Sequence, residues 1–126
     1  MAQALATISR VEDLGMIQIR ADLARAGDAI AGATGLAIPA QGMTVSDGTR
    51  RLGWMSPDEL LLVLPRAELA DALAALGDAL STEHALVLDV SDMRVAFRIT
   101  GPRAGQVLAK LSPAEIGAMP PDGLRR

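Results

Sequence analysis

The stretch that decides the fold is residues 50–64, RRLGWMSPDELLLVL, because it predicts a β-hairpin near the middle of the chain. Arg50 to Ser56 and Glu59 to Leu64 are two segments of strand length. Pro57-Asp58 lies between them, and these residue types begin a tight turn and cannot continue a strand ladder. The other predicted elements extend outward from this hairpin in both directions.

Around the hairpin, apolar periodicity predicts alternating strands and helices. Alternating apolar and polar residues over 16–20 are typical of a half-buried strand, and one apolar helical stripe runs over 66–80. Asp22 can cap a helix that Gly35 ends. The expected order is a strand at 16–20, a helix from Asp22 to Gly35, a loop over 37–49, the hairpin, a helix over 66–80, strands at 85–90 and 95–100, and a helix from Pro102 to Leu111.

This order predicts an α+β fold in a single domain, residues 1–126, since a chain of 126 residues supports one core. Residues 16–90 then form a ferredoxin-like βαββαβ unit, in which each helix follows a strand in the split arrangement. Residues 94–126 supply one more strand and one more helix. We interpret them as the start (βα) of a second copy of the unit.

A shift of 78 positions supports this duplication, because it superposes residues 17–31 on residues 95–109. The shift matches Arg25-Ala26-Gly27 with Arg103-Ala104-Gly105, although a chance match in an alanine-rich chain is the alternative. The second copy is apparently truncated, since the chain reaches Arg126 without a further hairpin. We therefore expect either that the natural protein continues or that another polypeptide completes the unit.

The second hairpin strand is apolar on both faces, because every residue after Glu59 is apolar. Its side chains alternate, with Leu60, Leu62 and Leu64 on one side and Leu61 and Val63 on the other. Two helices cover only one face, so the other face must meet a second sheet layer, the missing half of the duplication or a partner. A central strand packed on both sides within its own fold is the simpler interpretation. The candidate partner contacts are Trp54, Leu61 and Val63.

Composition excludes several classes of protein. With 15 acidic against 12 basic residues, the net charge is −3 and no basic stripe is present, so we expect no nucleic acid partner. The absence of cysteine excludes disulfides, thiolate nucleophiles and cysteine-bound zinc. No window approaches the ~20 apolar residues of a membrane span, and residues 1–5 lack the basic start of a signal peptide. We expect no membrane association, and a cytoplasmic location by default.

No catalytic, cofactor-binding or metal-binding residue is expected in this chain. His84 is the only histidine and has no cluster of carboxylates in the sequence around it. Ser91 lies with Asp89 and Asp92 in a predicted polar turn and lacks the surrounding glycines of a nucleophile elbow. Residues 101–105, GPRAG, lack the lysine of a P-loop and the third glycine of a dinucleotide fingerprint, so they predict a turn and the entry to a helix.

Four motifs of the sequence, taken in order, are residues 35–39 (GLAIP), 52–62 (LGWMSPDELLL), 88–94 (LDVSDMR) and 99–104 (ITGPRA). Together they resemble the gamma subunit of heterotetrameric sarcosine oxidase, and the resemblance covers nearly the whole chain. Two short pieces, Asp-Val-Ser and Thr-Gly-Pro, are also similar to the folate-binding domain of the glycine-cleavage aminomethyltransferase.

The resemblance implies a non-catalytic structural or assembly subunit of an enzyme that oxidatively demethylates sarcosine to glycine. In that family the large alpha and beta chains, the implied partners, hold the cofactors, which are FAD, FMN, NAD and tetrahydrofolate. The departure is length, since gamma chains run past the position that matches Arg126. The alternative is a free-standing folate-binding or one-carbon-transfer domain of the aminomethyltransferase type, for which Asp89 or Asp92 would face the pterin.

Overall fold

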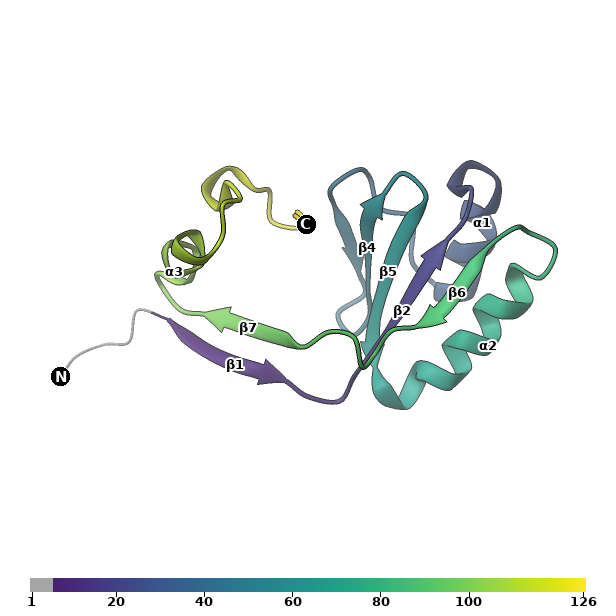
Figure 1. The fold of residues 1–126 in the computed structure, drawn as a ribbon, viewed down its shortest axis with the longest axis horizontal. Coiled ribbons are helices and arrows are strands. Elements are labelled where there is room, and N and C mark those ends of the chain that lie inside the picture. Colours follow the sequence, from purple (N-terminus) through teal and green to yellow (C-terminus); the bar gives the residue numbers. More distant parts are fainter. Residues whose placement is uncertain (1–5) are drawn as a thin grey trace.

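The computed structural model describes residues 6–126, and its main layer is a five-stranded sheet (Figure 1). The strand order is β3 (Thr44–Ser46), β4 (Arg51–Ser56), β5 (Glu59–Pro65), β2 (Leu14–Arg20) and β6 (Leu86–Asp89), and every neighbouring pair is antiparallel. Helices α1 (Leu23–Thr34) and α2 (Leu69–Ala79) lie on the same side of this sheet. The fold is therefore α+β, as predicted.

The β4–β5 hairpin forms where the sequence predicts it. Its register places Leu52 opposite Leu62 and Trp54 opposite Leu60, with a bulge just after Trp54. On its other side β5 pairs with β2 over all seven residues of both strands. β5 is therefore a central strand with a hydrogen-bonded neighbour on each side.

The core lies between the sheet and the two helices. The alternation of β2 and β5 sends every second aliphatic side chain toward α1 and α2, where each buried side chain stabilises the fold by about 1.5–3 kcal/mol. The helices contribute matching apolar stripes. The aliphatic side chains with 0% exposure are Ile17, Ile19, Ile30, Leu52, Leu60, Leu62, Leu64 and Leu76.

Helix α1 begins and ends at the residues that the sequence predicts. The Asp22 carboxylate accepts a hydrogen bond from the backbone N–H of Ala24 at 3.1 Å, which satisfies one free donor of the first turn. Gly35 adopts a left-handed conformation with φ of 71° and donates its N–H to the Ala31 carbonyl at 2.8 Å. Helix α2 begins after a short 3₁₀ turn at Arg66–Glu68.

The segment 37–49, expected to be a loop, contains the short strand β3, which pairs with β4. Three residues are too few to give a period-two pattern, so the sequence offers no signal for this strand. The predicted turn at 46–48 does form. Its Asp47 carboxylate accepts backbone N–H bonds from Arg50 at 2.7 Å and Thr49 at 2.9 Å, and these bonds lower the pKa of Asp47 from 3.8 to about 2.

A separate two-stranded sheet joins the first strand of the described chain to the strand that follows β6. β1 (Thr7–Val11) pairs antiparallel with β7 (Ala96–Thr100), and helix α3 (Ala104–Leu111) follows β7 as predicted. The predicted order begins at residue 16 and does not include β1. β1 is short and its partner is distant in the sequence, so local pattern gave no warning of the pairing.

The C-terminal segment returns to the five-stranded sheet beside β3. The Thr44 N–H donates to the Asp122 carbonyl at 2.8 Å, and the Leu124 N–H donates to the Gly42 carbonyl at 2.7 Å. The Leu124 side chain lies against the backbone of Gly53, only 2.7 Å from where a β-carbon would stand. This contact covers part of the sheet face that the helices leave open.

A helix that crosses a membrane needs about 20 apolar residues. Within residues 6–126 no helix has the length and apolar content to span a bilayer. The longest helix of this part is α1, with 12 residues. The expectation concerning a signal peptide rests on residues 1–5, which lie outside the described residues.

Replacing Leu62 with alanine should lower the free energy of unfolding by about 2–5 kcal/mol, since Leu62 has 0% exposure and its removal leaves a cavity at the centre of the sheet. Urea unfolding followed by circular dichroism would measure this change. The matched control is Leu111→Ala on α3, where the side chain is 71% exposed and the expected change is below about 0.5 kcal/mol. Equal losses in the two variants would contradict the described core.

Candidate functional site

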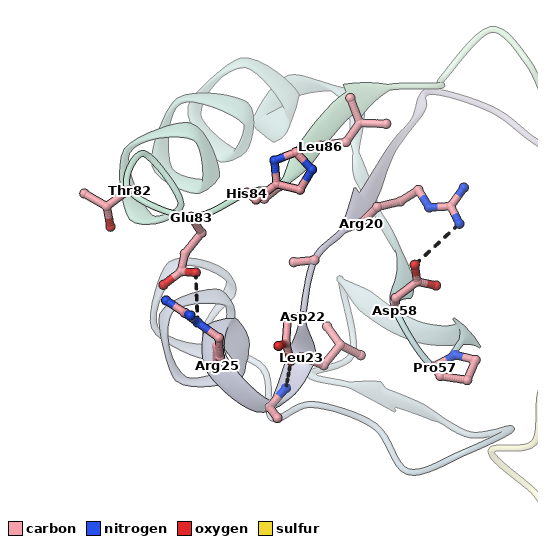
Figure 2. Close-up of a pocket in the computed structure, with 13 residues that line it drawn as sticks. Arg20, Asp22, Leu23, Arg25, Pro57, Asp58, Thr82, Glu83, His84 and Leu86 are labelled. Carbon is pink, nitrogen blue, oxygen red and sulfur yellow. Dashed lines mark hydrogen bonds and ion pairs between the residues drawn. The ribbon is translucent and has the colours of Figure 1, made fainter.

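An open cleft of about 970 Å³ lies where β2 ends and α1 begins, beside the loop that leads into β6 (Figure 2). Two ion pairs stand on opposite sides of it. Arg20 Nη2 lies 3.6 Å from Asp58 Oδ2, and Arg25 Nε lies 3.5 Å from Glu83 Oε2. These four charges neutralise one another in pairs, so the cleft offers little net attraction to a charged ligand.

Two carboxylates of the cleft, those of Asp22 and Asp58, have structural roles. Asp22 caps α1 through its carboxylate. The pKa of Asp58 is lowered first by the hydrogen bond that Ser56 Oγ donates to it at 2.8 Å, and then by the charge of Arg20. A carboxyl with a lowered pKa is a poor general base at neutral pH, because that role needs a pKa near the working pH.

His84 lines this cleft and lies just before the first residue of β6 (Figure 2). Among residues 6–126, no group of three or more His, Cys, Asp or Glu side chains could hold a metal ion. Ser91 lies beyond the opposite end of β6, roughly 20 Å away at the rise of an extended strand. The structure therefore does not bring His84 together with Ser91 and Asp92.

Ser91 instead ties the end of β6 to β2. Its Oγ accepts the Met16 backbone N–H at 2.9 Å and donates to Asp89 Oδ1 at 2.6 Å, and Ser91 is only 8% exposed. These bonds to Ser91 lower the pKa of Asp89. Asp92 faces away, and its carboxylate pairs with Arg66 Nη2 at 3.0 Å. The predicted polar turn is thus a structural anchor between two strands.

Residues 101–105 form the turn that the sequence predicts between β7 and α3. Gly101 has φ of 122°, a conformation that favours glycine, and its carbonyl accepts the Ala104 N–H at 3.2 Å. The Val107 N–H is likewise used, in a bond to the Arg103 carbonyl at 3.0 Å. Two donors of the helix entry are thus bonded within the chain, and the segment lacks the lysine that a P-loop places on the phosphates.

The features that stand out are therefore two apolar surfaces. The first, called here the ribbon face, is one side of the β1–β7 sheet. The pairing of Ile8 with Ile99 and the alternation along β7 place its apolar side chains together, and three of them are well exposed. The ribbon face contains Ile8 (56% exposed), Phe97 (62%), Ile99 and, just before β7, Val95 (56%), and the charged Arg10 lies on the same face opposite Phe97.

The second surface, called here the open face, is the side of the five-stranded sheet opposite the helices. The β2–β5 and β2–β6 registers place its aliphatic side chains on three adjacent strands, with Gln18 at the centre. Leu61 and Val63 are half-buried, whereas Leu86 and Leu88 on the edge strand are each 44% exposed. On each surface several exposed apolar side chains lie next to one another. Contiguous apolar surfaces of this kind are typical of sites that another polypeptide covers.

The three candidate contacts from the sequence do not lie together. Leu61 and Val63 belong to the open face, as expected from their alternation in β5. Trp54 lies opposite Leu60, on the helix side of the sheet, where it is half-buried against the core. The exposed Phe97 was not singled out, because its alternation looks the same for a buried strand and for an uncovered one.

Comparison with known proteins relates most of the chain to one family. Residues 19–119 match the family described as "Sarcosine oxidase, gamma subunit family". Sarcosine oxidase subunit gamma of Corynebacterium sp. (strain P-1) is 42% identical over 93 residues, covering 70% of this chain and 43% of the relative. The corresponding subunit of an Arthrobacter species is 37% identical over 105 residues, covering 79% of this chain and 50% of the relative. The chain spans about half the length of the curated relatives it matches.

Solved structures give the same relation. Heterotetrameric sarcosine oxidase from Corynebacterium sp. U-96, in complex with pyrrole 2-carboxylate, contains a chain that matches with a TM-score of 0.80 and 33% identity. The match covers 88% of this chain and 57% of the solved one. The glycine cleavage system aminomethyltransferase T from Bartonella henselae matches with a TM-score of 0.74 at 17% identity, over 98% of this chain and 36% of that one, and shows a likeness of fold alone.

Ser91→Ala should raise the pKa of Asp89 toward 3.8, since it removes the hydroxyl bond that stabilises the carboxylate. The lowered pKa of Asp89 contributes stability above pH 3.8, and this contribution is lost as pH falls through the folded pKa. The variant should therefore lose less stability than the parent between neutral pH and acid. It should also be less stable overall by about 1–3 kcal/mol, because the Met16 N–H loses its partner.

NMR titration of the Asp89 carboxyl and urea unfolding at several pH values would measure both effects. The matched control is Ser81→Ala, because Ser81 is exposed in the turn after α2. An unchanged Asp89 titration in Ser91→Ala would contradict the assigned hydrogen bond.

Proposed function

The chain belongs to the sarcosine oxidase gamma subunit family, and from this membership we propose that it is a non-catalytic structural and assembly subunit of a heterotetrameric sarcosine oxidase. The assembly would oxidatively demethylate sarcosine to glycine. The observation that carries the proposal is the match of the fold, at a TM-score of 0.80, to a chain of the solved heterotetrameric enzyme. Ser91 is bonded to Met16 and Asp89, Asp92 is paired with Arg66, and His84 lies apart from both at the other end of β6.

The partners in this proposal are the large alpha and beta subunits, and they hold the cofactors FAD, FMN, NAD and tetrahydrofolate. This chain's own residues do not fit such groups. In its GPRAG turn the Ala104 N–H is bonded to the Gly101 carbonyl, and within residues 6–126 no buried side-chain nitrogen or oxygen lacks a hydrogen-bond partner. A site built for a polar cofactor leaves such groups free to receive it. The cytoplasmic location stays a prediction.

In the same proposal, residues 16–90 form a ferredoxin-like unit and residues 94–126 belong to a second unit. The strand order β4, β5, β2, β6 supports this assignment, because each helix crosses over one intervening antiparallel strand. The pairing of β7 with β1, outside the first sheet, supports a second unit. The free-standing folate-binding domain has weaker support, since the aminomethyltransferase match is one of fold at 17% identity.

The open face is the surface we propose for contact with the large subunits. Leu61 and Val63 of β5 lie on one side of Gln18, and the exposed Leu86 and Leu88 extend the face to the sheet edge on the other. An aliphatic surface of this kind stabilises an assembly by leaving water, at about 25 cal/mol per Å² of apolar area. Trp54 is proposed as a support of the hairpin that carries Leu61.

Co-expression with candidate alpha and beta subunits, followed by pull-down on this chain, should recover a complex with flavin absorbance. Leu61→Asp should reduce recovery about tenfold or more, because an unpaired carboxylate at a desolvated interface costs several kcal/mol. Thr82→Asp, in the exposed turn after α2, is the control that should leave recovery unchanged. Each variant must have a melting temperature close to that of the unchanged chain, so that a lower recovery cannot come from unfolding. Sarcosine turnover by the purified chain alone would overturn the proposal.

A reduced folate should not raise the melting temperature of the isolated chain. A specific ligand at 100 times its Kd adds about 2.7 kcal/mol to the native state, which differential scanning fluorimetry detects readily. The intact aminomethyltransferase T, tested under the same conditions, provides the positive control. A clear upward shift would favour the folate-binding domain over the subunit.

A further inference from the structure

The two sheets of the protein are built on the same two passages of chain. In the first passage β1 leads into β2 through Glu12 and Asp13, and in the second β6 leads into β7 through residues 90–95. β1 pairs antiparallel with β7, and β2 pairs antiparallel with β6. The two passages therefore run side by side on both sides of a short interruption, and Figure 1 shows that the chain bends there.

The registers of the two pairings show how the interruption is built. The β2–β6 pairing reaches it with Ile17 opposite Asp89, and the β1–β7 pairing resumes with Val11 opposite Ala96. Between these pairs the first passage has five residues, 12–16, and the second passage has six, 90–95. One extra residue in one of two paired strands is the defining feature of a β-bulge, which bends the strand that contains it.

A tight turn in the second passage takes up the extra residue. The Met93 N–H donates to the Val90 carbonyl at 3.0 Å and closes this turn. Before the turn, the two passages are still bonded to each other. The Val90 N–H donates to the Met16 carbonyl at 2.9 Å, and the Met16 N–H donates to Ser91 Oγ at 2.9 Å. The break in the ladder therefore begins after Met16.

The first passage turns at Asp13. Its φ of 57° is the only positive value among the non-glycine residues that the structure describes, and aspartate is one of the residue types that adopt this left-handed conformation more readily. The Asp13 carbonyl accepts the backbone N–H of Arg66 at 2.7 Å. The turn is thereby fixed to the start of the 3₁₀ segment that precedes α2.

The Arg66 side chain connects both passages at the bend. Its Nε donates to the Leu14 carbonyl of the first passage at 3.3 Å, and its Nη2 donates to Asp92 Oδ1 of the second passage at 3.0 Å. A planar guanidinium presents several donors in fixed directions, which suits a contact with two separate acceptors. An opening of about 290 Å³, lined mainly by polar residues of both passages, lies beside Arg66, so apolar packing does not fix the bend at this point.

We propose that β1–β2 and β6–β7 form one long two-stranded ladder, bent by a slip of one residue, and that Arg66 is the positioning residue that sets the angle between its two arms. A bulge changes the direction of a ladder and leaves the pairing on either side intact. Changes at the bend therefore turn the ribbon face relative to the five-stranded sheet without altering either sheet. The inference rests on residues 7–100 and is independent of the proposed function.

A distance between the two arms measures the angle. The chain contains no cysteine, so Ser9→Cys on β1 and Ser81→Cys after α2, both at exposed positions, place two nitroxide labels at defined sites. Double electron–electron resonance should give one narrow distance distribution for this labelled parent. Circular dichroism and the melting temperature would verify that each further variant is folded.

Two variants remove the slip by making the passages equal in length. Deleting Met93, which is 74% exposed, leaves five residues in each passage, and inserting one alanine between Glu12 and Asp13 gives six in each. Both changes allow the ladder to continue in register, so each should shift the label distance to longer values as the arms straighten. A folded variant of either kind that keeps the parent distance would overturn the role of the slip.

Arg66→Met tests the positioning role, because it keeps an apolar stem and removes the bonds to Leu14 and Asp92. The distribution should broaden, with the displaced fraction rising about two- to fivefold, as expected when an exposed ion pair is lost. Arg66→Lys retains a charge near Asp92 and should recover part of the narrow distribution. An unchanged distribution in folded Arg66→Met would overturn the assignment.

Two controls separate Arg66 from other restraints. Arg50→Met removes a guanidinium that pairs with Asp47 and Glu68, away from the bend, and should leave the distance unchanged. Leu124→Ala weakens the contact of the C-terminal segment with Gly53, which is a second tie between the part of the chain after β7 and the main sheet. It should also leave the distance unchanged. Broadening in Leu124→Ala equal to that in Arg66→Met would assign the angle to the C-terminal segment and would overturn the proposal.

Discussion

The structure depends on the antiparallel pairing of β5 with β2 at the centre of the main sheet. All seven residues of each strand take part, and the alternation of both strands places Leu60, Leu62 and Leu64 beside Ile17 and Ile19 under the helices. The helices and the hairpin partner are arranged around this pair, because its core side contributes fully buried aliphatic side chains to the hydrophobic core. Its opposite side carries Leu61 and Val63, and the chain covers them only in part.

The sequence predicted those parts of the fold that local chemistry specifies. The limits of α1 followed from Asp22 and Gly35, whose side-chain and backbone conformations are needed at helix ends. The hairpin followed from Pro57-Asp58 between two apolar segments. The strands β1 and β3 were missed, because both are short and because the partner of β1 is distant in the sequence. Nonlocal pairing leaves little trace in a single sequence.

The candidate site shows the same division. The structural role of the polar turn at Ser91 was predicted from the absence of a nucleophile motif, and the hydrogen bonds to Met16 and Asp89 account for it. Exposure could not be predicted, since β2 and β7 have nearly the same alternation while Ile19 is buried and Phe97 is not. The difference comes from a neighbouring strand rather than from the residues themselves. A strand pattern therefore indicates which side is apolar, but the assembly around it decides whether that side meets water.

The joining of β1 to β7 has a consequence for the order of folding. Thr7 lies opposite Thr100, so the small sheet closes a loop that contains the entire five-stranded sheet and both of its helices. Closing so long a loop has a high entropic cost unless the intervening chain is already compact. The larger sheet must therefore condense first, and the ribbon forms late and opens first under mild denaturant. Its amides should be the part of the backbone that a protease or a chaperone meets earliest.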